Sequence, residues 1–371
     1  MATSTSDDNR TYPRIKWYRC PIDTANLREL TRRSDAKGLF YALGNLVPLA
    51  ITGYLSYYFF VREIWLGLAL ALWLHGTIRG VAKSAHHELA HGTVFKSKWL
   101  NALFQELWDL LIMSNYHHYK LSHTYHHLYT LHQDGDGEVA LPNKLPTKVL
   151  KWLELITFDL TLFIKDIRIR FKVAFTGRYD DEWSARIFTP KQSATFKRAI
   201  VWDRIHLGFH VAVAVASVIF GLWIIPVLVT LGNYIGKWYI KLIGATMHTG
   251  LRDNVADFRL CCRTIKLDPF SGFIRWNMQY HIEHHMFAAV PCYNLGKLYR
   301  AVASDMPERR TLVGAWKEML AVQRRQRTDP EYQFDTSLPS ATESATQMDP
   351  LSADIGDLRP KRFVESPPKS P

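Results

Sequence analysis

Histidines grouped at short spacings are the residues of this chain best suited to chemistry. There are three clusters: His87 with His91, His123 with His126 and His127, and His281 with His284 and His285. Residues three or four apart share one face of a helix, so each cluster can direct two or three imidazoles at a common point. Imidazole is a common metal ligand, and these donors exceed the roughly four ligands of zinc and about six of iron. The clusters therefore predict two metal ions, and iron fits the donor count.

The segments that must position these histidines contain long uncharged runs. Residues 38–61, 64–78 and 205–236 carry no Asp, Glu, Lys or Arg. A membrane-crossing helix needs about 20 apolar residues, so the first two runs predict a helical hairpin and the third is long enough for a second, turning near Pro226. We predict an all-α integral membrane fold with four transmembrane helices in two hairpins. The expected spans are residues 39–60, 64–82, 205–223 and 225–246.

The positions of the clusters set the expected topology. The first two clusters precede the second hairpin and the third follows it, so all three can meet only if an even number of spans separates them. Lys237 and Lys241 fall in the fourth span, where they would reach toward the head groups. A single tilted span over 205–236 is the alternative, but it would place the third cluster across the membrane. A helix from Ile64 to His91 would be about 42 Å long, against about 30 Å of hydrocarbon, which predicts a histidine-rich cap beyond the lipid.

Positive charge predicts the orientation and the domain organisation. Residues 1–37 hold eight Lys and Arg, whereas the predicted external turns hold only Arg62. The positive-inside rule then places both termini and the cap in the cytosol, at the endoplasmic reticulum in a eukaryotic cell, where the four cysteines would be reduced. We expect no cleavable signal peptide. The expected organisation is a cytosolic N-terminal segment (1–37), a membrane domain (38–328) and a disordered tail (329–371) rich in Ser, Thr and Pro.

The formal net charge of +12 also predicts partners. Because the cations flank membrane spans, anionic lipid head groups and an acidic electron carrier are expected, and nucleic acid is not. Residues 150–163 carry an apolar stripe followed by Lys165, Arg168, Arg170 and Lys172. This pattern favours an amphipathic helix at the membrane surface over an ordinary core-facing helix.

The order and spacing of the clusters resemble the membrane fatty acid desaturase and hydroxylase superfamily. Its pattern of HxxxH, HxxHH and HxxHH is met over roughly residues 38–320, and the segment from Asn277 through His285 to Pro291 is similar to the extended context of the third box. The resemblance implies two non-haem irons, dioxygen as co-substrate, a long lipid chain as substrate and one further ligand, matched here by His248. The implied metal ligands are His87, His91, His123, His126, His127, His248, His281, His284 and His285.

The same resemblance leaves the reaction with one main alternative. Removing a second hydrogen from the chain gives an alkene, whereas inserting oxygen gives an alcohol, and we expect a desaturase with a lipid hydroxylase as the alternative. Cleaving dioxygen takes two external electrons in either reaction. The chain has no HPGG haem motif, so cytochrome b5 or a ferredoxin is the expected donor.

Other residues near the clusters have less specific interpretations. His87-Glu88-Leu-Ala-His91 is also a literal HExxH, which would suit a zinc metalloprotease or zinc transporter, but both leave two HxxHH triplets unexplained. Asp134, Asp136 and Glu138 either orient the second cluster or form a solvated loop. Asn277 either orients His281 or is structural. The remaining histidines considered are expected to be neighbours or packed polar residues: His86, His117, His118, His132, His206 and His210.

Overall fold

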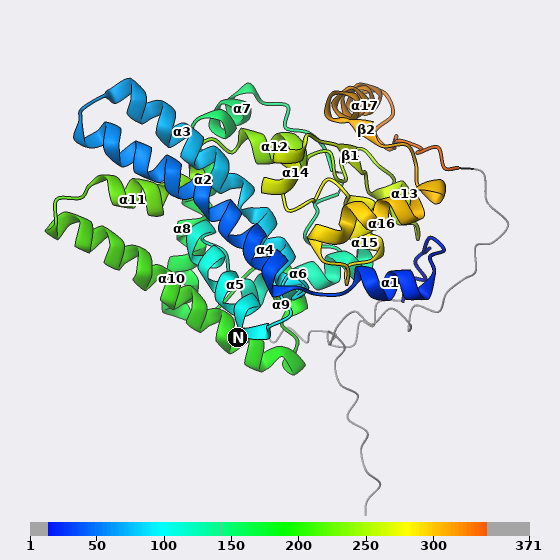
Figure 1. The fold of residues 1–371 in the computed structure, drawn as a ribbon, viewed down its shortest axis with the longest axis horizontal. Helices are drawn as coiled ribbons and strands as arrows, with labels where there is room; N and C mark the ends of the chain where they lie inside the picture. The colour runs from blue at the N-terminus through cyan, green and yellow to red at the C-terminus, as the bar shows by residue number, and fades with distance from the viewer. Residues whose placement is uncertain (1–13, 142, 340–371) are drawn as a thin grey trace, which may run out of the picture.

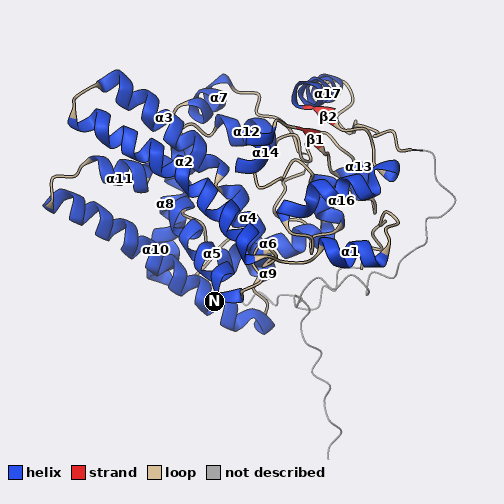
Figure 2. Ribbon diagram, in the orientation of Figure 1, coloured by secondary structure: helices blue, strands red, loops and turns tan. Residues whose placement is uncertain are grey.

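The computed structural model describes residues 14–141 and 143–339 of the 371-residue chain. Most of the predicted tail, residues 340–371, lies outside the described residues, as do residues 1–13 of the N-terminal segment. The fold is helical, and Figure 2 shows the two short strands β1 (Ile265–Lys266) and β2 (Arg310–Thr311) within it. They pair in parallel, Ile265 with Arg310.

The first hairpin consists of α2 (Asp35–Val61) and α3 (Trp65–Val81). Ser34 caps α2 by accepting a hydrogen bond from the backbone N–H of Lys37, and the turn between the helices contains Arg62 and Glu63. α2 exposes Phe40, Leu43, Val47, Ile51 and Tyr54 at helical spacing and buries small or polar residues such as Ala42, Thr52 and Ser56. An apolar face turned outward and a polar face turned inward is what a lipid environment selects.

The second hairpin begins with α10 (Ser193–Ile219) and turns back into α11 (Ile224–Val229). α10 has the same inside-out pattern, because Asp203, His206 and His210 are buried whereas Val211 and Val215 are exposed. Among the described residues, three helical stretches are long and apolar enough to cross a membrane: Asp35–Val61, Trp65–Ala90 and Pro190–Ile219. The expected helix over 225–246 is absent from this group.

That fourth segment returns toward the cap in pieces. α11 is followed by the 3-10 helix η2 (Leu231–Tyr234), an extended link and α12 (Trp238–Gly244). At the break, Gly236 has a φ of 59° and its N–H bonds the carbonyl of Thr157 at 2.9 Å. The guanidinium of Arg79 donates to the carbonyls of Leu228 and Val229. These contacts satisfy backbone groups that a helix would have paired internally, which is why the segment can be broken at membrane depth.

The cap is built from shorter elements around the ends of the spans. Its largest buried cluster joins Trp108, Phe258, Trp276 and Leu298. Residues 329–339, which the sequence predicts to be part of the disordered tail, contact the cap. The N–H of Phe334 donates to the carbonyl of Gly250 at 2.8 Å. The remaining elements are α1 (Thr24–Leu30), α4 (Lys83–Ala90), α5 (Lys98–Ile112), α6 (Tyr116–Tyr129), α7 (Val149–Ile156), α8 (Leu160–Thr176), α9 (Glu182–Ile187), η1 (Pro190–Gln192), α13 (Phe258–Cys261), α14 (Pro269–Ile274), α15 (His281–Met286), η3 (Cys292–Asn294), α16 (Leu295–Val302), η4 (Ala303–Asp305) and α17 (Leu312–Arg325).

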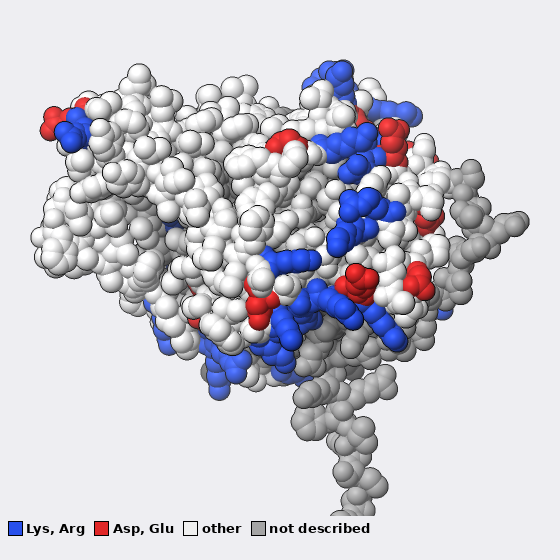
Figure 3. Space-filling model, viewed as in Figure 1, with Lys and Arg blue, Asp and Glu red and all other residues white. Residues whose placement is uncertain are grey.

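The arrangement separates an apolar end from a charged end. In Figure 1 the turns of both hairpins point to the left, and α13, α15, α16 and α17 lie toward the opposite end with α1. Figure 3 shows a left half almost free of charged side chains except at the tip, and Lys and Arg across the lower and right parts. The spans and the cap therefore occupy different ends of the molecule.

Candidate metal centre

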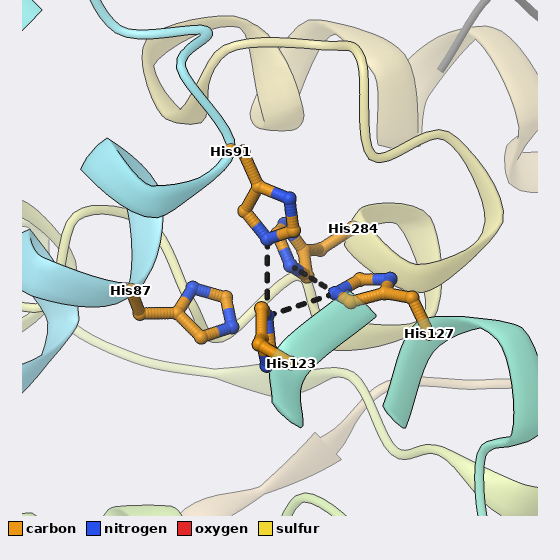
Figure 4. Close-up of side chains that lie close together, drawn as sticks. All are labelled: His87, His91, His123, His127 and His284. Carbon is orange, nitrogen blue, oxygen red and sulfur yellow. Dashed lines mark hydrogen bonds between the residues drawn. The ribbon is translucent and has the colours of Figure 1, made fainter. Parts of the chain in front are cut away.

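Two groups of histidines meet where the spans join the cap. The first contains His87, His91, His123, His127 and His284, and the second contains His126, His248, His281 and His285. Within each group the candidate ligand atoms all lie within 4.8 Å of one another. Figure 4 shows the rings of the first group converging from separate elements. All nine histidines expected from the sequence are thus brought together, as five and four.

Helix geometry explains how each HxxHH triplet serves both groups. On α6, His123 and His127 are four residues apart and share the face that meets the first group, while His126 is rotated toward the second. On α15 the assignment is reversed, because His281 and His285 face the second group and His284 the first. His91 follows α4, and His248 lies in the turn after α12.

The ring nitrogens that face one another are Nε2 atoms. The Nε2 atom of His123 is 3.1 Å from that of His91 and 3.0 Å from that of His127. In the second group, the Nε2 atom of His281 is 2.8 Å from that of His248 and 3.2 Å from that of His285. The two groups are also adjacent, with the rings of His127 and His285 stacked 4.3 Å apart.

Several Nδ1 atoms instead point outward to hydrogen-bond partners, whereas those of His127, His281 and His284 have none among the described residues. His126 bonds Asp136 at 2.8 Å, and His248 bonds the carbonyl of Cys261 at 2.9 Å. His123 lies 3.2 Å from Glu138. Carbonyl and carboxylate oxygens can only accept, so these Nδ1 atoms carry the proton and each Nε2 presents its lone pair inward. Converging lone pairs without a proton between them repel, and a cation between them removes the repulsion.

Burial keeps most of these imidazoles neutral. It lowers the pKa of His91 and of His248 to about 3, and it holds the pKa of His281 and His285 well below the usual value. His126 differs, because although burial lowers its pKa, the carboxylate of Asp136 outweighs this and raises it. A group of neutral nitrogen donors with carboxylates behind it suits a metal ion.

Glu88 connects ligands from two different boxes. Its side chain is completely buried, and its Oε1 atom lies 3.1 Å from Nδ1 of His87 and 3.3 Å from Nδ1 of His284. It therefore approaches the rings from the side opposite the converging Nε2 atoms. A metalloprotease base must face the metal and its water, so the position of Glu88 does not favour the protease alternative.

Two residues in the left-handed region, one buried and one half-buried, lead into the third box. Trp276 and Asn277 have φ values of 52° and 57°, a conformation that costs about 1–3 kcal/mol each for residues other than glycine. The amide of Asn277 donates to the hydroxyl of Tyr41 at 2.7 Å and to the carbonyl of Cys292. Asn277 is therefore structural, holding the turn that orients α15.

The other residues singled out from the sequence fall into two sets, those that contact the proposed ligands and those that do not. Asp136 and Glu138 contact the second box, whereas Asp134 contributes a backbone carbonyl to Arg186. Outside both groups, His86 bonds Asp109, and His118 bonds Ser184. The orienting contacts of Glu88, Thr130 and Cys261 were not anticipated; Thr130 lies 3.1 Å from Nδ1 of His285. Glu88 was considered only as a protease base, although its place between two ligands was a signal.

The two groups differ in access. All four members of the second group are buried, whereas His87, His91 and His127 of the first are half-buried. An incoming molecule can therefore approach the five-histidine group more easily than the four-histidine group.

Comparison with known proteins agrees with this arrangement. The chain is 24% identical over 272 residues to the sn-1 acyl-lipid omega-3 desaturase (ferredoxin) of Synechocystis, an alignment that covers 70% of this chain and 72% of the relative. A sequence model described as fatty acid desaturase matches residues 63–316, which include all three boxes and His248. The chain therefore belongs to the fatty acid desaturase family.

Proposed function

We propose that this protein is a membrane-bound, dioxygen-dependent di-iron desaturase that introduces a double bond into a long lipid chain. The observation that carries the proposal is the pair of adjacent groups of converging Nε2 atoms, with the Nδ1 atoms of His126 and His248 bonded to acceptors outside. Its family membership supports lipid-chain oxidation, and the name of its Synechocystis relative supports desaturation.

The residues fit two metal ions. His87, His91, His123, His127 and His284 would hold one, and His126, His248, His281 and His285 the other. A bound iron pair would supply the redox chemistry of C–H oxidation by dioxygen. The chain itself orients the rings through Asp136, Glu138 and the carbonyl of Cys261. The half-buried edges of the five-histidine group are where substrate would make contact.

Lipid hydroxylation is the second candidate on the same ligands. The choice between the two outcomes depends on placing the substrate carbon to within about an ångström. The relative's name favours desaturation. For either reaction, the four predicted spans correspond to three long helical stretches and one broken segment. A cytosolic cap and an endoplasmic reticulum location remain part of the proposal.

Metal content tests the proposal directly. Purified protein is expected to contain two irons per chain, because nine imidazoles form two sets and a single four-coordinate zinc would leave one set empty. Elemental analysis by plasma mass spectrometry gives the ratio. One zinc and no iron in active protein would contradict the di-iron proposal.

The mass of the lipid product in cells identifies the reaction. Cells expressing the gene are expected to contain a lipid lighter by two hydrogens than its precursor, and this product should disappear with His281→Ala, which removes a proposed ligand. Mass spectrometry of lipid extracts makes the comparison. A product heavier by one oxygen would establish the hydroxylase instead.

The electron donor is proposed to be an acidic carrier, cytochrome b5 or a ferredoxin. α1 contacts α16, and together with the link after α1 they expose Arg28, Arg32, Arg33, Lys297 and Arg300. We call these five residues the α1–α16 basic face. α16 also contacts α15, which carries the third box. A carrier bound there would lie behind the metal ligands.

Salt should weaken this docking. At limiting carrier, turnover is expected to fall as ionic strength rises past the point where the Debye length is about 8 Å. Turnover at saturating carrier should change much less, because chemistry rather than encounter then limits the rate. Steady-state rates at both carrier concentrations provide the comparison, and salt-independent turnover at limiting carrier would rule out electrostatic docking.

A further inference from the structure

The buried cation Lys237 has no ion-pair partner among the residues that the structure describes. Lys237 follows the break in the fourth segment and is only 4% exposed, yet its ammonium group has no hydrogen-bond partner in the part of the chain that the structure describes. The ring of Tyr234 lies 5.8 Å from it, at the outer limit of a cation–π contact. Burying an ammonium group without a partner is costly, and a bound anion would remove that cost.

A second lysine comes toward the same place from the first hairpin. Lys237 packs against Gly80, where an added Cβ would lie 4.0 Å from the Cα of Lys237. Lys83 is three residues after Gly80 in the helical stretch Trp65–Ala90, just past the junction of α3 and α4 at Ala82, and it is exposed. Lys83 carries the same sign of charge as Lys237 and therefore cannot neutralise it.

The nearby acids are already engaged elsewhere. Asp159 accepts from the ammonium group of Lys151 at 2.7 Å, and it also caps α8. Asp166 accepts from the hydroxyl of Tyr234 at 3.2 Å. Neither bonds Lys237, so among the described residues Lys83 and Lys237 share no anion.

The excess of positive charge extends toward the metal centre. Arg275, at the end of α14, is 2% exposed, and its Nε and Nη2 atoms have no partner among the described residues. The hydroxyl of Tyr239 on α12 donates to Ser271 of α14, which ties the element beginning after Lys237 to the one ending at Arg275. This region is therefore rich in donors and poor in acceptors.

We propose that Lys83 and Lys237 form a binding site for an oxyanion, the carboxylate or phosphate of an amphiphilic substrate. The identification of the ligand as substrate rests on the proposed desaturase function. Lys83 is four residues before His87, about 6 Å along the helix axis, so a bound head group would lie beside the five-histidine group. Lys83 is also about 27 Å along the helix from Trp65, near the edge of a hydrocarbon core of about 30 Å, which is the depth of lipid head groups.

The site gives the enzyme a preference for anionic amphiphiles. The exposed Lys83 would meet the anion first, and the buried Lys237 would complete its coordination in a region with little water. Neutral chains of the same length would have nothing to bond there. The substrate class is thus a free acyl carboxylate or a phosphate-bearing lipid rather than a neutral ester or alcohol.

Equilibrium binding to purified, iron-loaded protein in detergent tests this without turnover. The probes are radiolabelled oleate, dioleoyl phosphatidate and, as the neutral analogue, oleyl alcohol, with no reductant or electron carrier present. Lys83→Met and Lys237→Met should each weaken anion binding by at least about tenfold, as expected for losing a charge-assisted hydrogen bond. Lys241→Met is the matched control, because it removes a lysine one turn further along α12.

A second measurement separates binding from misfolding. Without ligand, Lys237→Met should melt at the same temperature as wild type or higher, since it removes an unpaired buried charge. Preference for oleate or for phosphatidate identifies the source of the oxyanion. Equal binding of oleyl alcohol, or unchanged anion binding in both lysine variants, would overturn the site. Lysine-dependent anion binding by a protein that oxidises no lipid would instead refute the desaturase function and leave the site intact.

Discussion

Replacing His248 by alanine is expected to remove one iron and reduce turnover by at least about 100-fold, since even outer contacts of a metal cost about 10–100-fold in affinity. The four-histidine group would keep only His126, His281 and His285. Its rings are buried, so water cannot easily replace the missing donor. Iron content per chain and turnover with saturating electron carrier are the two measurements.

The matched control for this change is His118→Ala. His118 bonds Ser184 and belongs to neither group of histidines, so its loss should leave two irons per chain. Both proteins should express similarly, because the spanning helices are untouched. A His248→Ala protein with two irons and normal turnover would show that His248 is not a ligand.

The histidine clusters were predictable because their spacing is a local property. Residues three and four apart meet on a helix whatever surrounds it, and the nine residues named from the sequence are those that the structure brings together. The division of each triplet between two groups was not predictable. It depends on how α6 and α15 are rotated against each other, which is a matter of tertiary packing.

The first hairpin was also predictable, whereas the broken fourth segment was not. Hydropathy depends only on the composition of a segment, and by composition residues 225–246 are apolar enough for a span. The break depends on partners distant in the chain, since Gly236 bonds Thr157 and Arg79 bonds the carbonyl of Leu228. The same break buries the side chain of Lys237. In the continuous span that the sequence predicts, this lysine would reach the head groups of the bilayer.

Glu88 was the residue whose role the sequence most obscured. Read as a motif, it suggests a catalytic base, and in a di-iron scheme it has no assigned task. The structure places one of its oxygens within 3.3 Å of Nδ1 atoms on both His87 and His284. The carboxylate is hydrogen-bonded to His87 and lies within ion-pair distance of His284, so it contacts two rings from different helices at once.

Glu88→Gln is therefore expected to weaken iron binding at the five-histidine site by about 10–100-fold. The amide keeps one acceptor oxygen but brings an NH2 group toward ring N–H donors, so the two imidazoles can no longer both be held. Iron retention during dialysis against a graded chelator gives the affinity of the weaker site. The Mössbauer spectrum should show one altered iron environment and one preserved.

Glu283→Gln is the control, because Glu283 is equally buried but accepts a hydrogen bond from Thr264 at 2.6 Å and no ligand imidazole. An amide can still accept that bond, so both irons should be retained as in wild type. If Glu88→Gln kept both irons and only turnover were lost, Glu88 would act on a reacting group instead of positioning ligands. Loss of iron in Glu88→Gln alone would establish that the buried carboxylate couples the first box to the third.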